Sequence, residues 1–294
     1  MTSGGGPLRG IRVVSTAVNV PGPAAVARLV GLGADAVKVE PPGGDPLEAA
    51  SPRWYAELSA GQQVVRLDLK DSADRDRLER LLGEADLLLT SSRTTALERL
   101  DLGWEALHDR HPRLCHVAVV GHPAPDDDLP GPDLTYQAAL GLLAAGAADG
   151  RLEEPRMPVL LVADLAGAER AATEAAAALV ERSVTGVGCR REVALSDAAE
   201  TMAAPLRHGL TLPGAVLGGG DPGYRLYAAR QGHVAVACLE PHFLARLADL
   251  LGVPAVAEDL AAVFTTRTAA DWEAWGREHD LPLAEVTAVG PLRH

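Results

Sequence analysis

Residues 11–40 read IRVVSTAVNVPGPAAVARLVGLGADAVKVE, and this stretch decides the fold. The apolar run at 11–15 predicts a short buried strand, and AVKVE at Ala36–Glu40 predicts a second. Between them Ala24–Leu32 is predicted to be a helix, with Pro23 in its first turn, where a missing N–H costs nothing. Strand, helix and strand in about 30 residues are typical of a parallel pair with a crossover helix, so the chain opens with a βαβ unit.

The alternation of strand and helix continues to about residue 121. Three further strands are predicted, at Gln63–Leu69, Asp86–Thr90 and Leu114–Gly121. Two helices are predicted between them, Asp71–Gly83 with Ser72 as its N-cap, and Thr95–Leu107. Repeated βα units of this kind indicate an α/β protein with a doubly wound sheet.

The second half of the chain changes character after Pro213. Before that point, helices are predicted at Tyr136–Gly146 and Asp164–Arg182, and one more strand at Glu192–Leu195. After it come an antiparallel hairpin and two short helices, at Arg225–Ala229 with His233–Cys238, Pro241–Leu251 and Thr268–Glu278. We therefore expect a large α/β domain over residues 1–205 and a smaller α+β domain over residues 206–294.

Composition excludes several classes of protein. The chain has 294 residues, 47% of them hydrophobic, which predicts a packed globule. Its net charge of −13 argues against a nucleic-acid or anionic-membrane partner. No apolar run approaches the roughly 18 residues that span a bilayer, and the first ten residues lack the apolar core of a signal peptide. Three widely spaced cysteines fit reduced thiols, so we expect a cytoplasmic protein.

Common nucleotide and metal motifs are absent from the sequence. The turn of the βαβ unit reads VNVPGPAA rather than GxGxxG, although Glu40 stands where a ribose-binding acid would. A plain structural crossover is the better interpretation. Gly218–Gly220 is not followed by Lys-Ser or Lys-Thr, and the nine histidines lack the spacing of metal ligands. We expect no metal site.

Two aspartates are candidates for chemistry. Asp133 follows a Pro/Gly loop and precedes the predicted helix LTYQAALGLL, and Asp164 likewise begins a helix. For each, the simpler role is a helix N-cap. The alternative is that carboxylates at the starts of successive helices face one cleft. That arrangement would raise one pKa and equip the site for nucleophilic or acid/base work.

Together these segments resemble the family III CoA transferases and the related α-methylacyl-CoA racemases, over almost the whole chain. The matching blocks are PLRGIRVV with VPGPAA, LGADAVKVEPPGGDP, LDLK at 67–70, LERLDLGWEAL at 97–107, HPRLCHVAVVG at 111–121, PGPDLTYQAALGLL at 130–143, VLLVADLAGA at 159–168 and GYRLYAARQGHVAVACLEPHF at 223–243.

The resemblance implies a Rossmann-like large domain in an interlocked homodimer. It implies a small-molecule acyl-CoA or carboxylic acid as partner, with CoA as cosubstrate and no permanently bound cofactor. Asp133 falls on the position of the transferase nucleophile, which forms a mixed anhydride and then an aspartyl-CoA thioester. Asp164 falls on the acid/base aspartate of the racemases, and Glu240 on a glutamate that supports their catalysis.

The resemblance also assigns binding residues, and the sequence departs from the family at several others. Gly22 lies in the VPGP turn at the expected entrance to a CoA site, and Lys38 and Arg93 lie where the family places cations near CoA.

The departures are Pro132 at the position of the racemase histidine, Gln62-Gln63 at a basic pair, three aspartates at 126–128 in the loop before Asp133, and the absence of the family's last segment. The resemblance therefore implies a shortened, diverged member.

Three hypotheses follow. The first is CoA transfer through Asp133, which the absence of the racemase histidine favours. The second is α-proton chemistry of the racemase or epimerase type, using Asp164 and Glu240. The third is a member that has lost CoA chemistry and acts as a binding protein or on another substrate, which Gln62-Gln63 and the acidic loop favour.

Overall fold

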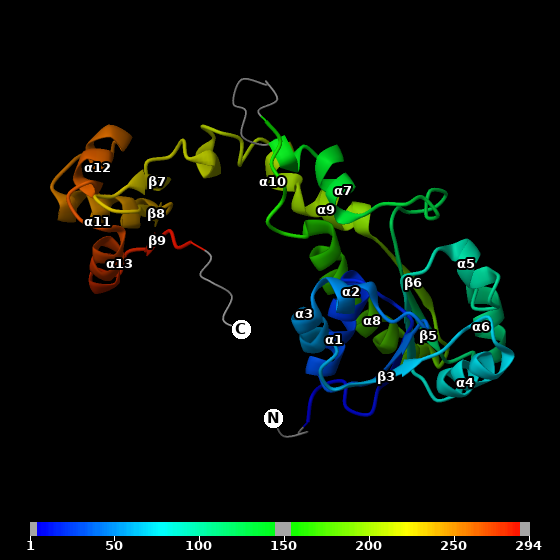
Figure 1. Ribbon diagram of the computed structural model, residues 1–294. Coiled ribbons are helices and arrows are strands. Elements are labelled where there is room, and N and C mark those ends of the chain that lie inside the picture. The colour runs from blue at the N-terminus through cyan, green and yellow to red at the C-terminus, as the bar shows by residue number, and fades with distance from the viewer. Residues whose placement is uncertain (1–4, 145–153, 289–294) are drawn as a thin grey trace. The chain divides into compact units, whose positions relative to one another are not determined.

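The chain folds into two compact units (Figure 1). The computed structural model describes residues 5–144 and 154–288. One unit comprises Met1–Leu142 with Met157–Ala203, and the other comprises Leu143–Arg156 with Ala204–His294.

A six-stranded sheet with the order β3-β2-β1-β4-β5-β6 forms the centre of the first unit. Its strands are β1 Arg12–Ser15, β2 Asp35–Glu40, β3 Gln62–Arg66, β4 Leu87–Thr90, β5 Cys115–Val120 and β6 Arg190–Ala194. Every neighbouring pair is parallel. This strand order is that of the Rossmann fold, and it confirms the predicted α/β class with a parallel sheet.

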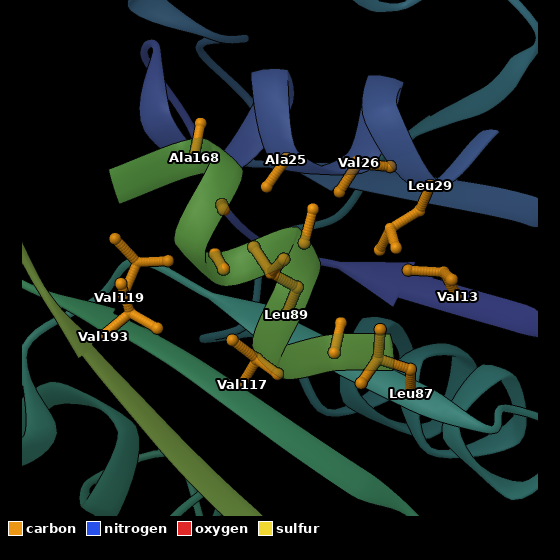
Figure 2. Packing of buried hydrophobic residues seen from close by; sticks show 14 of the residues in the cluster. Val13, Ala25, Val26, Leu29, Leu87, Leu89, Val117, Val119, Ala168 and Val193 are labelled. Atoms are coloured by element: carbon orange, nitrogen blue, oxygen red, sulfur yellow. The ribbon is translucent and has the colours of Figure 1, made fainter. Parts of the chain in front are cut away.

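Helices cover both faces of this sheet. Helices α1 Pro21–Gly31 and α8 Val162–Thr185 pack on one face, against Val13, Leu87, Leu89 and other strand residues, as Figure 2 shows. The opposite face packs against α4 Ser72–Gly83, α5 Thr94–Glu98 and α6 Trp104–Arg110. Successive strand residues point to opposite faces, so Leu87 and Leu88 belong to different cores.

The buried face of α8 consists mainly of small side chains. They are Ala163, Gly167, Ala168, Ala171, Ala172, Ala175 and Ala178. A β-carbon on Gly167 would lie 2.3 Å from the Leu195 side chain, so the spacing leaves no room for a larger residue there. This small-residue face lets α8 pack closely on α1 and on the sheet, and it fixes where the first turn of α8 lies.

Several shorter helices complete the first unit. They are α2 Pro46–Ala50, α3 Pro52–Leu58, α7 Asp133–Ala139 and α9 Leu195–Met202. A 3₁₀ turn at Leu142–Ala144 spans the boundary between the two units. The sequence analysis did not predict α2, α3 or α9. The segment of α2 and α3 was not assigned to any element, and α9 begins at Leu195, the last residue of the predicted strand Glu192–Leu195.

The second unit holds a three-stranded antiparallel sheet in the order β7-β8-β9. Its elements are α10 Ala204–Arg207, a 3₁₀ turn at Val216–Gly218, β7 Tyr224–Ala228, β8 His233–Ala237, α11 Pro241–Leu251, α12 Ala257–Phe264, α13 Ala269–Glu278 and β9 Leu283–Glu285. An aromatic core joins sheet and helices, and in it Trp272 Nε1 donates a hydrogen bond to the carbonyl of Phe264 at 2.7 Å. The predicted hairpin is confirmed.

Three predicted helices differ from those observed. The segment Thr95–Leu107 contains two helices rather than one, because Asp101 adopts φ +56° between them. Asp71, not Ser72, caps α4, since its carboxylate accepts the N–H groups of Ala73 and Asp74. The predicted helix Tyr136–Gly146 ends at Ala139, and its last two residues lie outside the described residues.

Within residues 5–144 and 154–288, no helix is both long and apolar enough to cross a bilayer. The same part of the chain contains no group of three or more His, Cys, Asp or Glu side chains placed to hold a metal ion.

Candidate active site

A pocket of about 680 Å³ lies at the carboxyl ends of the strands of the first unit. Its walls come from the loops after three adjacent strands, namely Val18–Pro21 after β1, Ser91–Arg93 after β4 and Gly121 with Asp127–Asp133 after β5, together with α2 and the first turn of α8. β1 and β4 are the neighbours at which the strand order reverses. Ligands of open α/β sheets bind at this switch point, so the pocket is the candidate active site.

The start of α1 lies against this pocket, and it is a poor phosphate site. Helix N-termini bind phosphate through unpaired backbone N–H groups. Pro21 and Pro23 carry no N–H, and the N–H of Ala24 is bonded to the carbonyl of Val20. Of the first three helix residues, only Gly22 can donate.

Gly22 is buried and does not line the pocket. A β-carbon there would lie 2.1 Å from the β-carbon of Ala17. The glycine therefore allows α1 to pack closely on the loop that follows β1. The VPGP turn contributes to the pocket wall through Val20 and Pro21 instead.

Asp133 is the first residue of α7, and its side chain caps a different helix. One carboxylate oxygen, Oδ1, accepts the N–H of Ala163 at 2.7 Å and the N–H of Asp164 at 3.1 Å, in the first turn of α8. The other, Oδ2, accepts a hydrogen bond from Gln137 Nε2. The sequence suggested a cap for Asp133's own helix, but Pro132 holds that N-cap position.

Gln137 ties α7 to the segment that precedes α8. Its Nε2 also donates to the carbonyl of Leu160 at 2.8 Å. The side chain is buried and lies one helical turn after Asp133. Asp133 and Gln137 together fix the first turn of α8, and with it the position of Asp164.

Asp164 lines the pocket with a half-buried side chain. Burial, and the charge of the nearby Asp133 carboxylate, raise the pKa of Asp164 to about 6. Within the described part of the chain, no hydrogen bond or ion pair engages its carboxylate. Asp164 is therefore a carboxylate of raised basicity that faces open space.

Tyr136 packs beside the two aspartates. A β-carbon on Gly131 would lie 2.1 Å from its hydroxyl oxygen, and one on Gly121 would lie 2.7 Å away. The hydroxyl is buried, and no residue in the described part of the chain forms a hydrogen bond with it. Burial, and the charges of Asp164 and Asp133, raise the pKa of this phenol, so it remains protonated. Its ring fixes the loop between β5 and α7.

Arg93 and the acidic loop lie on the other side of the pocket. Arg93 is exposed and lines the pocket, and no carboxylate of the described residues pairs with it. Asp127 accepts a hydrogen bond from the Thr94 hydroxyl at 2.5 Å, and Asp128 accepts the N–H of Thr95 at 3.4 Å. Two of the three loop aspartates are thus held at the start of α5, beside the cation of Arg93.

Comparison with known proteins identifies the family. The profile described as CoA-transferase family III matches residues 8–293. This chain belongs to CoA-transferase family III. The match confirms the resemblance found in the sequence, and it makes acyl-CoA the expected class of substrate.

Relatives of this chain are named for two kinds of reaction. The chain is 27% identical to cinnamoyl-CoA:phenyllactate CoA-transferase of Clostridium sporogenes, over 94% of the chain and 77% of that protein. It is 30% identical to α-methylacyl-CoA racemase of Homo sapiens, over 90% of the chain and 74% of that protein.

Solved structures agree with the fold. The crystal structure of the hypothetical protein Rv3272 from Mycobacterium tuberculosis superposes with a TM-score of 0.82 at 25% identity, over 97% of this chain and 87% of that one. A CAIB/BAIF family protein from Brucella suis gives 0.78 at 23% identity, over 97% and 85% of the two chains.

Besides Gly22, two other site residues expected from the sequence, Lys38 and Glu240, are not among the residues that line the pocket. Lys38 is buried and pairs with Glu40 and Asp45, and it does not line the pocket. Glu240 belongs to the second unit, where its exposed side chain stands at the N-cap position of α11 without making a capping hydrogen bond.

Gln137 and Tyr136 are site residues that the sequence analysis missed. Asp133 and Gln137 are four residues apart on α7, and this spacing places the two side chains on one face. That spacing was the available signal for Gln137. No pattern in the sequence predicts that Tyr136 packs against Gly121 and Gly131, because those contacts join residues of a loop whose path only the tertiary structure defines.

Proposed function

We propose that this chain transfers CoA from an acyl-CoA to a carboxylic acid, with Asp164 as the carboxylate that attacks the thioester. The observation that carries this proposal is the difference between the two pocket aspartates. The oxygens of Asp133 accept three hydrogen bonds, whereas the carboxylate of Asp164 is unengaged and faces the pocket.

This assignment departs from the expectation that Asp133 is the nucleophile. An attack by Asp133 would use lone pairs that bind the N–H groups of Ala163 and Asp164, and it would uncap α8. Asp133 is better suited to position Asp164 and to raise its pKa. A carboxylate of higher basicity is the stronger nucleophile, and a pKa of about 6 leaves Asp164 mostly ionised at pH 7.

The proposed reaction proceeds by covalent exchange. A carboxylate oxygen of Asp164 attacks the thioester carbon, and the CoA thiolate leaves to give a mixed anhydride. The thiolate then attacks the aspartyl carbonyl, which releases the acyl group as a carboxylate and leaves an aspartyl-CoA thioester. The acceptor carboxylate reverses these two steps, so that it departs as the new acyl-CoA and Asp164 is regenerated.

The pocket suits the two ends of such a substrate differently. Arg93 supplies an unpaired cation at the rim, suited to a phosphate of CoA. Val20, Leu47, Leu129 and Leu195 also line the pocket and give it apolar surface, suited to an acyl chain. The transferase name of the Clostridium sporogenes relative supports the same reaction class.

The second candidate is α-proton exchange on an acyl-CoA. The 30% identity to the Homo sapiens racemase favours it, and the pKa of about 6 at Asp164 suits a general acid/base. A two-base mechanism needs a partner group on the opposite face, and Pro132 stands at the position of the racemase histidine. Deuterium incorporation at the α-carbon, lost in an Asp164→Asn variant, would support this candidate over transfer.

We further propose that the protein is a homodimer. Apolar side chains around the approach to α8 are exposed to a degree unusual for a monomer, with Val159 96% and Leu160 62% exposed. Val180 and Val184, further along the same helix, are 65% and 83% exposed. Sedimentation equilibrium tests this proposal, and a species with the 30.6 kDa mass of one chain would contradict it.

Trapping the covalent intermediate tests the transferase. The protein is incubated with an acyl-CoA and quenched with hydroxylamine, which converts an aspartyl anhydride or thioester into a hydroxamate. Trypsin separates the two candidates, because Asp133 falls in the peptide of residues 114–151 and Asp164 in that of residues 157–170. We expect the hydroxamate in the second peptide, and in neither peptide of an Asp164→Ala variant.

The outcomes separate the alternatives. A hydroxamate on the peptide that contains Asp133, or full transfer activity in Asp164→Ala, would contradict the role of Asp164. If calorimetry detects no CoA binding to the unmodified protein, the hypothesis that CoA chemistry has been lost replaces transfer.

A further inference from the structure

Lys38 lies in the interior with two carboxylates. Its side chain is 1% exposed, and its Nζ lies 2.6 Å from Asp45 Oδ2 and 2.9 Å from Glu40 Oε1. The ammonium also lies 4.5 Å above the centre of the Tyr55 ring, whose hydroxyl donates to Glu40 at 2.7 Å. All sides of this cation are thus occupied by protein groups, so no ligand phosphate can reach it.

Asp45 connects Lys38 to two walls of the pocket. While Oδ2 binds Lys38, Oδ1 accepts the N–H of Asn19 and the N–H of Leu47, both at 2.9 Å. Asn19 lies in the loop after β1, and Leu47 lies in α2, which Asp45 caps. Both of these residues line the pocket.

The hydrogen bond to Asn19 holds an uncommon backbone conformation. Asn19 has φ +67°, in the left-handed region that non-glycine residues seldom occupy. The loop is held on its other side where the N–H of Val18 donates to the Ser91 hydroxyl at 3.2 Å. Asn19 therefore depends on Asp45, and the fully buried carboxylate of Asp45 depends on a counter-charge.

We infer that Lys38 is a positioning residue of the acyl-CoA pocket, which acts through Asp45 on the backbone of Asn19 and on α2. The inference rests on the proposed function for the identity of the ligand. It gives Lys38 a role different from the phosphate contact expected from the sequence. The residue neutralises Asp45, and Asp45 fixes the wall that faces the reacting groups.

Charge compensation tests this inference. Lys38→Met leaves the Asp45 carboxylate buried without its nearest cation, so we expect the KM for acyl-CoA to rise at least about tenfold, with kcat within about threefold of wild type. Adding Asp45→Asn removes the Asp45 charge, while Glu40 keeps the Arg66 guanidinium at 3.5 Å. The asparagine oxygen can still accept the N–H groups of Asn19 and Leu47. The double variant is expected to return to within about threefold of the wild-type KM.

A further variant and a control complete the set. In Asp45→Asn alone, the oxygen that accepts the N–H groups of Asn19 and Leu47 leaves the amide NH2 facing the Lys38 ammonium, so its KM should lie above that of the double variant, in which this ammonium is absent. Arg12→Met removes a cation from β1 that forms an exposed ion pair with Glu84 outside the pocket, and should leave the KM unchanged.

A second readout does not depend on catalysis. Amide hydrogen exchange of Asn19 and Leu47 should be at least about tenfold faster in Lys38→Met and near wild type in the double variant. If the unmodified protein neither binds nor turns over acyl-CoA, the proposed function fails, and exchange alone decides the role of Lys38.

Two results would overturn the inference. One is a double variant with a KM as high as that of Lys38→Met, which would show that the ligand itself needs the ammonium. The other is unchanged amide exchange at Asn19 in a folded Lys38→Met protein, which would show that Lys38 does not hold the pocket wall.

Discussion

The side-chain carboxylate of Asp133 accepts a hydrogen bond from the backbone N–H of Asp164 at 3.1 Å, across 31 residues of chain. One aspartate therefore caps the helix whose first turn carries the other. Burial raises the pKa of Asp164, and the negative charge that this contact keeps close by raises it further. Asp133 thus positions Asp164 and adds to the effect of burial on its ionisation.

Asp164→Asn is expected to abolish transfer and to stabilise the fold. Loss of the attacking carboxylate should lower kcat/KM by at least about 10³-fold. The folded-state pKa of about 6 exceeds the ordinary aspartate value of 3.8, so the folded protein favours the protonated form. Protonated Asp164 therefore makes its full contribution to the stability of the folded state below pH 3.8, and this contribution is lost as the carboxyl ionises and the pH rises through 6.

At pH 7.5 the neutral asparagine should therefore raise the free energy of unfolding, by about 1 kcal/mol after allowance for partial exposure of the site. Urea unfolding at about pH 7.5 and about pH 4 measures this, and the gain should vanish at the lower pH. Asp109 is exposed, so Asp109→Asn is the matched control. Its free energy of unfolding should match that of wild type at both pH values. A destabilised Asp164→Asn protein at pH 7.5 would contradict the prediction.

The pH profile of kcat/KM should have an acidic limb near pH 6, because only ionised Asp164 attacks the thioester. Asp133→Asn removes the neighbouring negative charge and leaves the burial. Its acidic limb should therefore move to lower pH, whatever happens to the absolute rate. An unmoved limb in a folded variant would show that Asp133 does not control the ionisation of Asp164.

Arg93→Gln is expected to weaken CoA binding about tenfold, because it removes an unpaired cation from the pocket rim. The salt dependence of the Kd should also become shallower, since one charge contact is lost. Isothermal calorimetry at two ionic strengths measures both effects. Arg113→Gln, an exposed arginine outside the pocket, serves as control, and equal losses in the two variants would count against a phosphate contact at Arg93.

Gly22→Ala should destabilise the first unit by about 2 kcal/mol, because its new β-carbon would overlap that of Ala17. Adding Ala17→Gly removes the overlapping atom and should recover at least about half of the loss. Thermal unfolding of the single and double variants is the measurement. If the double variant is no more stable than Gly22→Ala, the close approach of these two residues is not what requires glycine.

Sequence patterns predicted the elements whose signal is local. The βαβ unit, the parallel strands and the hairpin of the second unit rest on apolar periodicity and turn residues, and the structure contains them. The break between α5 and α6 was missed, because apolar spacing continues across Asp101 and only its left-handed backbone interrupts the helix.

The candidate site was predictable in its residue types but not in its contacts. Asp133 and Asp164 could be singled out because both begin helices. Which helix Asp133 caps depends on the path of the loop between α7 and α8, and no local pattern encodes it. Lys38 shows the same limit, since an isolated lysine on a strand gives no sign that Asp45 and Glu40 surround it.

The prolines at the start of α1 determine which molecules can compete for this pocket. Many proteins with the same strand order hold the pyrophosphate of NAD or a related nucleotide on the first helix of the sheet. Here Pro21 and Pro23 lack the backbone N–H groups that would donate hydrogen bonds to such a pyrophosphate. Dinucleotides therefore lack their usual anchor at this helix, and under the proposed function the discrimination between CoA and other adenine nucleotides would depend on side chains such as Arg93.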